Sequence, residues 1–177
     1  MDVSAPITLA VAGYRSPARA EADYDAVWRA RGEPPFSHTC LAIVLQDRAG
    51  TSRIERTDNT AGALAWGDAV LGAALSVLLP RIGPGSPVIG DRDGQEAFIG
   101  HFRRHIDVTE LVSAALLLDD SAVGLVVVVL NRRPDEVLPL LSHAGEAIAT
   151  GTSWAGLEDD LGHDLVRAVA GRVPSLT

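Results

Sequence analysis

The first third of the chain alternates between strand-like and helix-like spacing of its apolar residues. Strands are predicted at about 7–14 and 39–46, where apolar residues alternate with small or polar ones. Between them, a proline-initiated helix is predicted at about 17–31. A further strand at 52–57 carries charged residues and is expected at a sheet edge. The segment 7–57 is therefore predicted to form a βαβ arm with one added edge strand.

The last third of the chain repeats this order of elements. A nearly unbroken apolar run at 122–130 favours a central strand that is covered on both faces. A short helix follows at about 137–141, then a strand at 146–153 and a final amphipathic helix at about 155–170. The segment 122–153 is therefore predicted to be a second βαβ arm.

Two βαβ arms in one antiparallel sheet indicate an α+β protein of the ferredoxin-like, split-βαβ plan. The plan places the first strand of each arm at the sheet centre, and those are the two more apolar strands. We expect a single domain over residues 1–177. A helical insert at about 60–118 joins the arms and is much longer than an ordinary connection. Since a ferredoxin-like sheet leaves one face uncovered by its own helices, the insert or another subunit must cover that face.

The insert begins with a helix at about 61–79 that is rich in glycine and alanine. It is apolar almost all round, which indicates burial on several sides. Its small side chains form a smooth strip that lets another helix come close. The stretch just reaches the length of a membrane span, which needs roughly 20 residues. A membrane contact is therefore the alternative to packing against protein. We predict a helix-packing or oligomer contact made by Ala61, Ala65, Ala69, Gly72 and Ala73.

Asp68 interrupts this helix near its leucine face. A carboxylate buried there has to be paired or protonated, because burying an isolated charge is costly. A charge within the helix also argues against a membrane span. The candidate partners of the carboxylate are Arg81, Arg92, Arg103 and Arg104.

The amino-acid composition of the chain excludes several classes of function. The net charge is −8 and the isoelectric point about 5.0, which is unsuited to a phosphate backbone, so we expect no nucleic-acid partner. The chain has no lysine, since its 15 Lys/Arg residues are all arginines, and this excludes Schiff-base and lysine-dependent phosphate chemistry. A single cysteine, Cys40, excludes an intramolecular disulfide and a cysteine-based zinc site. The N-terminus lacks a signal-peptide pattern, so we expect a cytoplasmic protein, and we predict no cofactor.

His101 and His105 lie four positions apart in the sequence His-Phe-Arg-Arg-His, so they share one face of a predicted helix. This spacing can chelate a metal. However, the intervening arginines repel a cation, and Phe102 stands where a metalloprotease motif needs glutamate, so no metal site is predicted. The basic residues of this segment suit an anionic ligand instead. The candidate ligand-binding residues are Asp68, His101, Arg103, Arg104 and His105.

Several segments of the chain together form a recognisable pattern. They are the Gly/Ala-rich residues 61–76, His105-Ile106-Asp107 before a helix, Asp120-Ser121-Ala122 before the strand at 123–130, and the segments 135–141 and 145–152. The pattern resembles an uncharacterised bacterial domain family with a ferredoxin-like core and an inserted glycine-zipper segment, whose members are often described as membrane proteins. The resemblance implies this fold and a membrane, envelope or stress association, with no catalytic residues. Here alanines replace several zipper glycines.

The leading hypothesis is a non-enzymatic protein that associates with itself as a homodimer or a larger assembly. A first alternative is a small-molecule-binding protein or enzyme of the dimeric α/β-barrel type, with a cavity between sheet and insert. A second alternative is integral or peripheral membrane association through residues 61–79.

Overall fold

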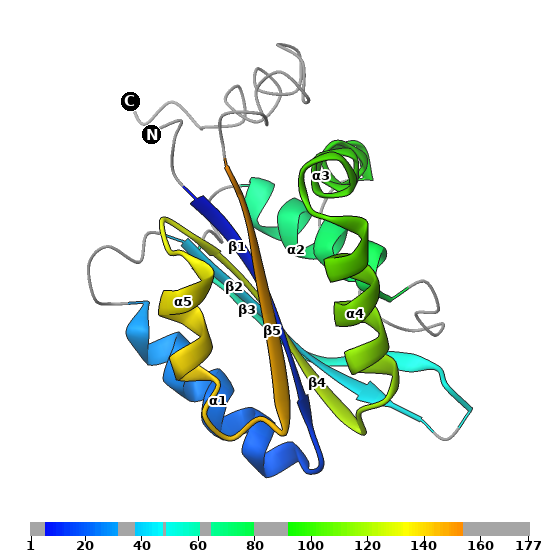
Figure 1. The fold of residues 1–177 in the computed structure, drawn as a ribbon, viewed down its shortest axis with the longest axis vertical. Coiled ribbons are helices and arrows are strands. Elements are labelled where there is room, and N and C mark those ends of the chain that lie inside the picture. The colour runs from blue at the N-terminus through cyan, green and yellow to red at the C-terminus, as the bar shows by residue number, and fades with distance from the viewer. Residues whose placement is uncertain (1–5, 32–37, 48, 61–64, 80–91, 154–177) are drawn as a thin grey trace, which may run out of the picture.

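A computed structural model of the chain contains the predicted strands and helices from residue 6 to residue 153. They form one antiparallel sheet with helices on both faces (Figure 1). The predicted C-terminal helix at 155–170 and the predicted contact residue Ala61 lie outside the described part of the chain. The described residues are 6–31, 38–47, 49–60, 65–79 and 92–153.

The sheet follows the ferredoxin-like strand order with one strand added. Neighbouring strands are antiparallel throughout. The first strands of the two arms, β1 and β4, are central and pair with each other, and β3 extends the sheet beyond β2. The predicted α+β class is therefore confirmed. The strands are β1 (Pro6–Tyr14), β2 (His38–Gln46), β3 (Ser52–Asn59), β4 (Val123–Leu130) and β5 (Glu146–Ser153), in the order β3-β2-β4-β1-β5.

One face of the sheet is covered by the helices of the two arms. They are α1 (Pro17–Ala30) after β1, and α5 (Pro134–Val137) with the 3-10 helix η1 (Leu138–Leu140) after β4 (Figure 1). Helix α1 begins with a proline at its first position, as predicted, because the missing proline N–H has no partner there in any case. The apolar core of this face includes Tyr14, Tyr24, Val27, Leu125 and Val127.

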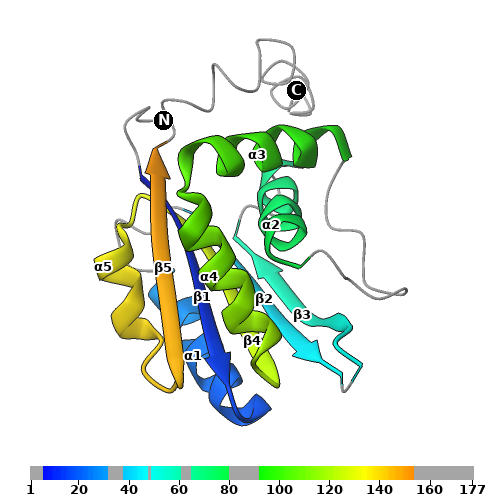
Figure 2. The same ribbon diagram turned by 45° about the vertical axis from the view of Figure 1, so that its right-hand side comes forward.

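The opposite face is covered by the insert itself. It contains α2 (Ala65–Leu78) and α4 (Val108–Asp119), which lie over the sheet, and α3 (Arg92–His105), which packs against α2 (Figures 1 and 2). Of the two coverings expected for this face, another subunit or the insert, the structure shows the insert. The core of this face includes Leu9, Val126, Leu71, Leu75, Phe98, Phe102 and Leu118.

Side chains of α4 and of the turn after it pack directly onto two glycines of the central strands. A Cβ added to Gly124 of β4 would overlap the Leu118 side chain, and one added to Gly13 of β1 would overlap Ser121. The side chains of Leu118 and Ser121 therefore fill the space that a larger residue at either glycine would need.

Candidate functional site

The structure divides the predicted basic cluster between the core and the surface. His101 is fully buried, and its Nε2 lies 3.3 Å from Oγ1 of Thr152 on β5. The ring of His105 lies 4.6 Å from that of His101 between centroids, so the two histidines share a helix face as expected. His105 is exposed together with Arg103 and Arg104. We call these three exposed residues, 103–105, the basic end of α3.

Asp68 occupies an exposed position of α2, so the expectation of a buried carboxylate at this position is wrong. Its carboxylate accepts a hydrogen bond from the side-chain amide of Asn59 at the end of β3. The neighbouring Cys40 is 2 % exposed, and its Sγ lies 3.5 Å from the carbonyl oxygen of Gly67. Burial, with the negative charge of Asp68 adding to it, raises the pKa of Cys40 to about 12. A thiol that stays protonated and buried is not a nucleophile.

The small-residue strip of α2 is packed inside the chain. Ala69, Gly72 and Ala73 are buried. Ala69 and Ala73 belong to the same core cluster as Phe98 and Phe102 of α3. The strip is therefore covered within one protomer. The side chain of the predicted contact residue Ala65, at the first position of α2, lies outside the described part of the chain.

A buried carboxylate that the sequence analysis did not single out joins three elements. Asp23 of α1 is fully buried. It accepts a hydrogen bond from the Tyr14 hydroxyl at 2.9 Å, and the backbone N–H of His143 donates to its Oδ2 at 3.0 Å. Its Oδ1 lies 2.6 Å from Nδ1 of the His143 imidazole. Helical spacing could have indicated this residue, since Asp23 lies between Ala20 and Val27 on the buried face of α1.

Asp23, Tyr14 and His143 form a hydrogen-bonded group, which we call the Asp23 centre and which holds the turn after η1 against α1. The His143 side chain is 54 % exposed, and its Nδ1 is taken by Asp23. Ser142 Oγ lies 3.4 Å from that same Nδ1, so it does not occupy the nucleophile position of a Ser-His-Asp triad, which faces Nε2. Burial, and then the charge of Asp23, raise the pKa of Tyr14, so its hydroxyl remains a hydrogen-bond donor.

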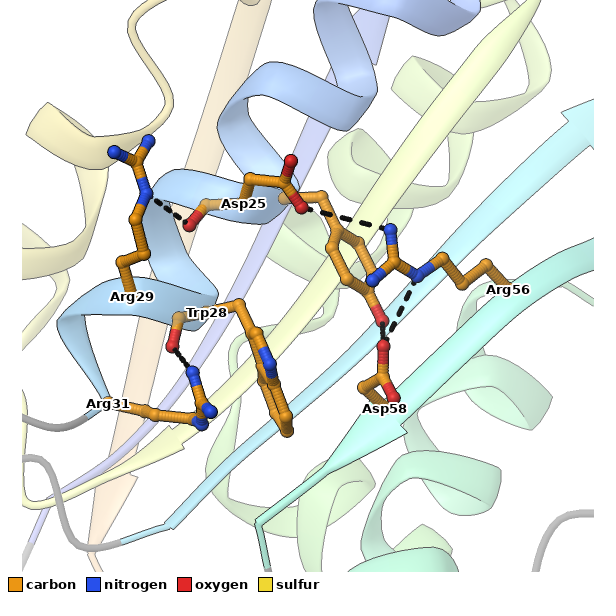
Figure 3. Close-up of polar contacts among 7 residues, drawn as sticks. Asp25, Trp28, Arg29, Arg31, Arg56 and Asp58 are labelled. Atoms are coloured by element: carbon orange, nitrogen blue, oxygen red, sulfur yellow. Dashed lines mark hydrogen bonds and ion pairs between the residues drawn. The ribbon is translucent and has the colours of Figure 1, made fainter.

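The edge strand β3 is tied to α1 by charged and aromatic side chains (Figure 3). The Tyr24 hydroxyl donates to Asp58 at 2.5 Å, and the Arg56 guanidinium lies 4.1 Å above the Tyr24 ring. Arg56 also lies 3.2 Å from Asp58 and 3.7 Å from Asp25. Charged side chains on an edge strand discourage pairing with another chain, so this edge is protected.

The other edge strand of the described sheet, β5, carries a single charged residue, Glu146. Gly13 on β1 accepts a hydrogen bond from Gly145, so alternate residues of β1 direct their backbone groups toward β5. By the register of the pair, Ala147, Ala149 and Gly151 direct theirs away from β1. Among the described residues, β5 pairs with β1 alone.

Helix α4 carries apolar residues on two faces. Leu111, Ala114 and Leu118 are buried against the sheet. On the outer side, Val108 is 71 % exposed, Val112 is 51 % exposed and Leu116 is 56 % exposed. These three residues, spaced four positions apart, form a continuous row along the helix, which we call the α4 stripe. The stripe holds three of the four exposed large hydrophobic residues in the described part of the chain.

Comparison with protein-family models, curated proteins and solved structures finds no match to this chain. Within the described ranges, no group of three or more His, Cys, Asp or Glu residues could hold a metal ion. Each helix placed in the structure is too short or too polar to cross a membrane. A function has to be argued from the structural features themselves. Three stand out, namely the α4 stripe, the edge of β5 and the Asp23 centre.

Proposed function

We propose that this chain is a non-enzymatic, self-associating protein whose contact surface is the α4 stripe. The observation that carries the proposal is the exposure of Val108, Val112 and Leu116 in one row. Scattered apolar residues are ordinary on protein surfaces, whereas contiguous rows mark contact sites. Each such side chain, once fully buried, contributes about 1.5–3 kcal/mol.

The placement of the insert favours this surface over an assembly of the dimeric α/β-barrel type. Such a barrel needs the open sheet faces of two subunits to enclose a common interior. Here α2, α3 and α4 already cover that face, and Leu71, Leu75 and Phe102 fill the space above it. On this side of the sheet, contact between two copies therefore has to use the outside of the helical layer.

The burial of the apolar side chains of α2 argues against a membrane contact made by this helix. Val70, Leu71, Ala74, Leu75 and Leu78 are each at most 1 % exposed. A bilayer could reach these side chains only if α2 left the protein core, which would expose the sheet face below it. The outer side of α4 needs no such rearrangement.

The substitution Val112→Lys tests the proposal, with Leu138→Lys as its matched control. Leu138 is also an exposed large hydrophobic residue, 36 % exposed, but it lies in η1 on the opposite face of the sheet. We expect the unmodified chain and Leu138→Lys to associate at micromolar concentration and Val112→Lys to remain monomeric. Since Val112 is half exposed, its replacement should change the melting temperature by less than about 2 °C.

Two outcomes would overturn the proposal. Undiminished association of Val112→Lys, abolished instead by Ala149→Pro, would assign the contact to strand addition at β5. A strictly monomeric protein in which Val112→Lys lowers the melting temperature by several degrees would show that the stripe is covered within the monomer. The proposal is supported if Val112→Lys lowers the mass measured in solution and Leu138→Lys does not.

A second candidate function is ligand binding at His143. The observation that favours it is a half-exposed imidazole held by a fully buried carboxylate, an arrangement that fixes one ring nitrogen and presents the other. Titration with Zn²⁺, followed by the ring resonances of His143, tests it. Saturable shifts that disappear in His143→Gln support binding, and unchanged resonances at millimolar Zn²⁺ contradict binding of this ion.

A further inference from the structure

We infer that Nε2 of His143 is a nucleophile that accepts a phosphoryl group from a small acyl phosphate. The inference is independent of self-association, and it uses the imidazole of the second candidate function. It starts from the Asp23 centre, where a fully buried carboxylate holds a half-exposed ring. The position of the ring proton, the access to the second nitrogen and the charge beside the first each favour this reaction.

The hydrogen bonds of Asp23 determine which ring nitrogen of His143 carries the proton. The carboxylate accepts from the Tyr14 hydroxyl and from the backbone N–H of His143, and these bonds engage both of its oxygens. An acceptor oxygen that lies 2.6 Å from Nδ1 requires a proton on that nitrogen, because two lone pairs would repel each other at this distance. The neutral ring is therefore inferred to carry its proton on Nδ1 and its lone pair on Nε2.

The second ring nitrogen of His143 is accessible to a reagent. Within the described ranges, the protein makes no hydrogen bond to Nε2, since the contacts of the ring with Asp23 and Ser142 both use Nδ1. The side chain is 54 % exposed. An imidazole that is fixed through one nitrogen and carries a lone pair on the other is typical of nucleophilic and ligand-binding histidines.

The buried carboxylate stabilises the ring while it reacts. When Nε2 attacks an electrophile, positive charge develops on the imidazole. The Asp23 oxygen that lies 2.6 Å from Nδ1 meets this charge through the Nδ1 proton. Because Asp23 is fully buried, water and salt screen its charge only weakly. A histidine that is surrounded by water alone lacks this preorganised charge.

The transfer balances without a further proton acceptor. The lone pair of Nε2 forms a bond to phosphorus, the bond between phosphorus and the acyl oxygen breaks, and the carboxylate of the donor leaves with the electron pair. Nδ1 keeps its proton throughout. The contact between His143 and Asp23 therefore persists in the product, whereas a phosphoryl group on Nδ1 would displace Asp23.

The surroundings of the ring favour a phosphoryl group over a metal ion or an acyl group. Zinc sites use several protein ligands, and the described residues include no group of three or more His, Cys, Asp or Glu that could hold a metal. Acyl transfer passes through an oxyanion that needs hydrogen-bond donors arranged around it. Phosphoryl transfer has a looser transition state and needs in-line access to the nucleophile, which a half-exposed ring allows.

Reaction with acetyl phosphate at neutral pH tests the inference, with N-acetylhistidine as the unassisted reference. Mass spectrometry of peptides assigns the modified histidine, and phosphorus NMR distinguishes a phosphoryl group on Nε2 from one on Nδ1. We expect His143 to be phosphorylated on Nε2 at a rate about tenfold or more above that of N-acetylhistidine. The variant His143→Gln should lose this signal.

Two further variants separate the reactivity of the ring from the stability of the fold. Asp23→Asn removes the charge beside Nδ1, and Tyr24→Phe removes a hydrogen bond to a different carboxylate, that of Asp58, from the next position of α1. Both lose a hydrogen bond of the fold. We expect Asp23→Asn to lower the rate about tenfold and Tyr24→Phe to change it less than about twofold. If Asp23→Asn does not fold, the comparison of the unmodified chain with N-acetylhistidine decides.

Three results would overturn the inference. They are a rate at His143 no higher than that of N-acetylhistidine, a phosphoryl group on Nδ1, and a rate in folded Asp23→Asn equal to that of the unmodified chain. None of them depends on the mass of the protein in solution, which tests the proposed self-association. Failure of this inference is therefore distinguishable from failure of the proposed function.

Discussion

Nδ1 of His143 lies 2.6 Å from Oδ1 of Asp23, although 120 residues separate them in the chain. Asp23 is fully buried, and the Tyr14 hydroxyl donates to its other oxygen. The contact joins the first βαβ arm to the turn that leads into β5, so it links the two ends of the described fold. It is also the clearest case of long-range organisation that no local pattern reveals.

Replacing this carboxylate by an amide should destabilise the fold. In Asp23→Asn, one acceptor oxygen becomes an NH₂ donor that faces the donors Tyr14 and His143, so a buried polar group loses its partner. The expected loss is about 1–3 kcal/mol, or a decrease of several degrees in melting temperature for a chain of this size. Thermal unfolding at neutral pH measures it.

The matched control for this substitution is Asp25→Asn, two positions along α1. The Asp25 side chain is 59 % exposed and forms a longer ion pair with Arg56, at 3.7 Å. Exposed pairs of this kind contribute little, so its melting temperature should stay within about 2 °C of the original. Equal effects of the two substitutions would contradict a structural role for the Asp23 centre.

The closely packed strip of α2 should not tolerate a large side chain. Ala69 is 3 % exposed and belongs to the core cluster shared with α3. Ala69→Leu adds three carbon atoms to that core and should cost about 1–3 kcal/mol through overpacking. Denaturant unfolding measures the loss. The exposed substitution Ser113→Leu is the control, and a comparable loss there would refute the assignment.

The thiol of Cys40 should be unreactive in the folded protein. Burial raises its pKa to about 12, so almost no thiolate forms at pH 8, and the side chain is 2 % exposed. A thiol-specific dye should label the native chain far more slowly than the unfolded chain in guanidinium. Equally fast labelling of both states would show that this part of the sheet opens readily.

Glu136 should stabilise the start of α5 in a pH-dependent manner. Its carboxylate accepts hydrogen bonds from the backbone N–H of Arg133 and the side chain of Arg132, and these lower its pKa. A lowered pKa means that the contribution is complete above about pH 4.5 and is lost as the pH falls through the folded-state pKa. Glu136→Gln should therefore lower the melting temperature at pH 7, on the order of 1 °C, and the difference should vanish at acidic pH. A difference that grows on acidification would contradict this.

The sequence predicted the sheet well because burial leaves a local pattern in strands. The unbroken apolar run of β4 follows from cover on both faces, and the charges of β3 follow from its place at an edge. The insert was predicted from the same periodicity. Which element covers the open sheet face could not be predicted, since a buried helix is apolar whether its neighbour belongs to the same chain or another.

The candidate site was less predictable for three different physical reasons. Asp68 was assigned to the leucine face, but a helix apolar nearly all round does not define which side is exposed. The partner of Asp23 lies on another arm, and pairing over such a distance leaves no local spacing. The α4 stripe did leave a signal, the spacing of Val108, Val112 and Leu116, because a short helix with two apolar faces can bury only one against its own sheet.

We propose that the chain covers its α4 stripe with a second copy of itself. Sedimentation equilibrium of the unmodified protein without detergent, over a range of micromolar concentrations, tests this most directly. We expect a mass that rises from 18.6 kDa toward twice that value as concentration increases. A mass that stays at 18.6 kDa at every concentration would contradict it.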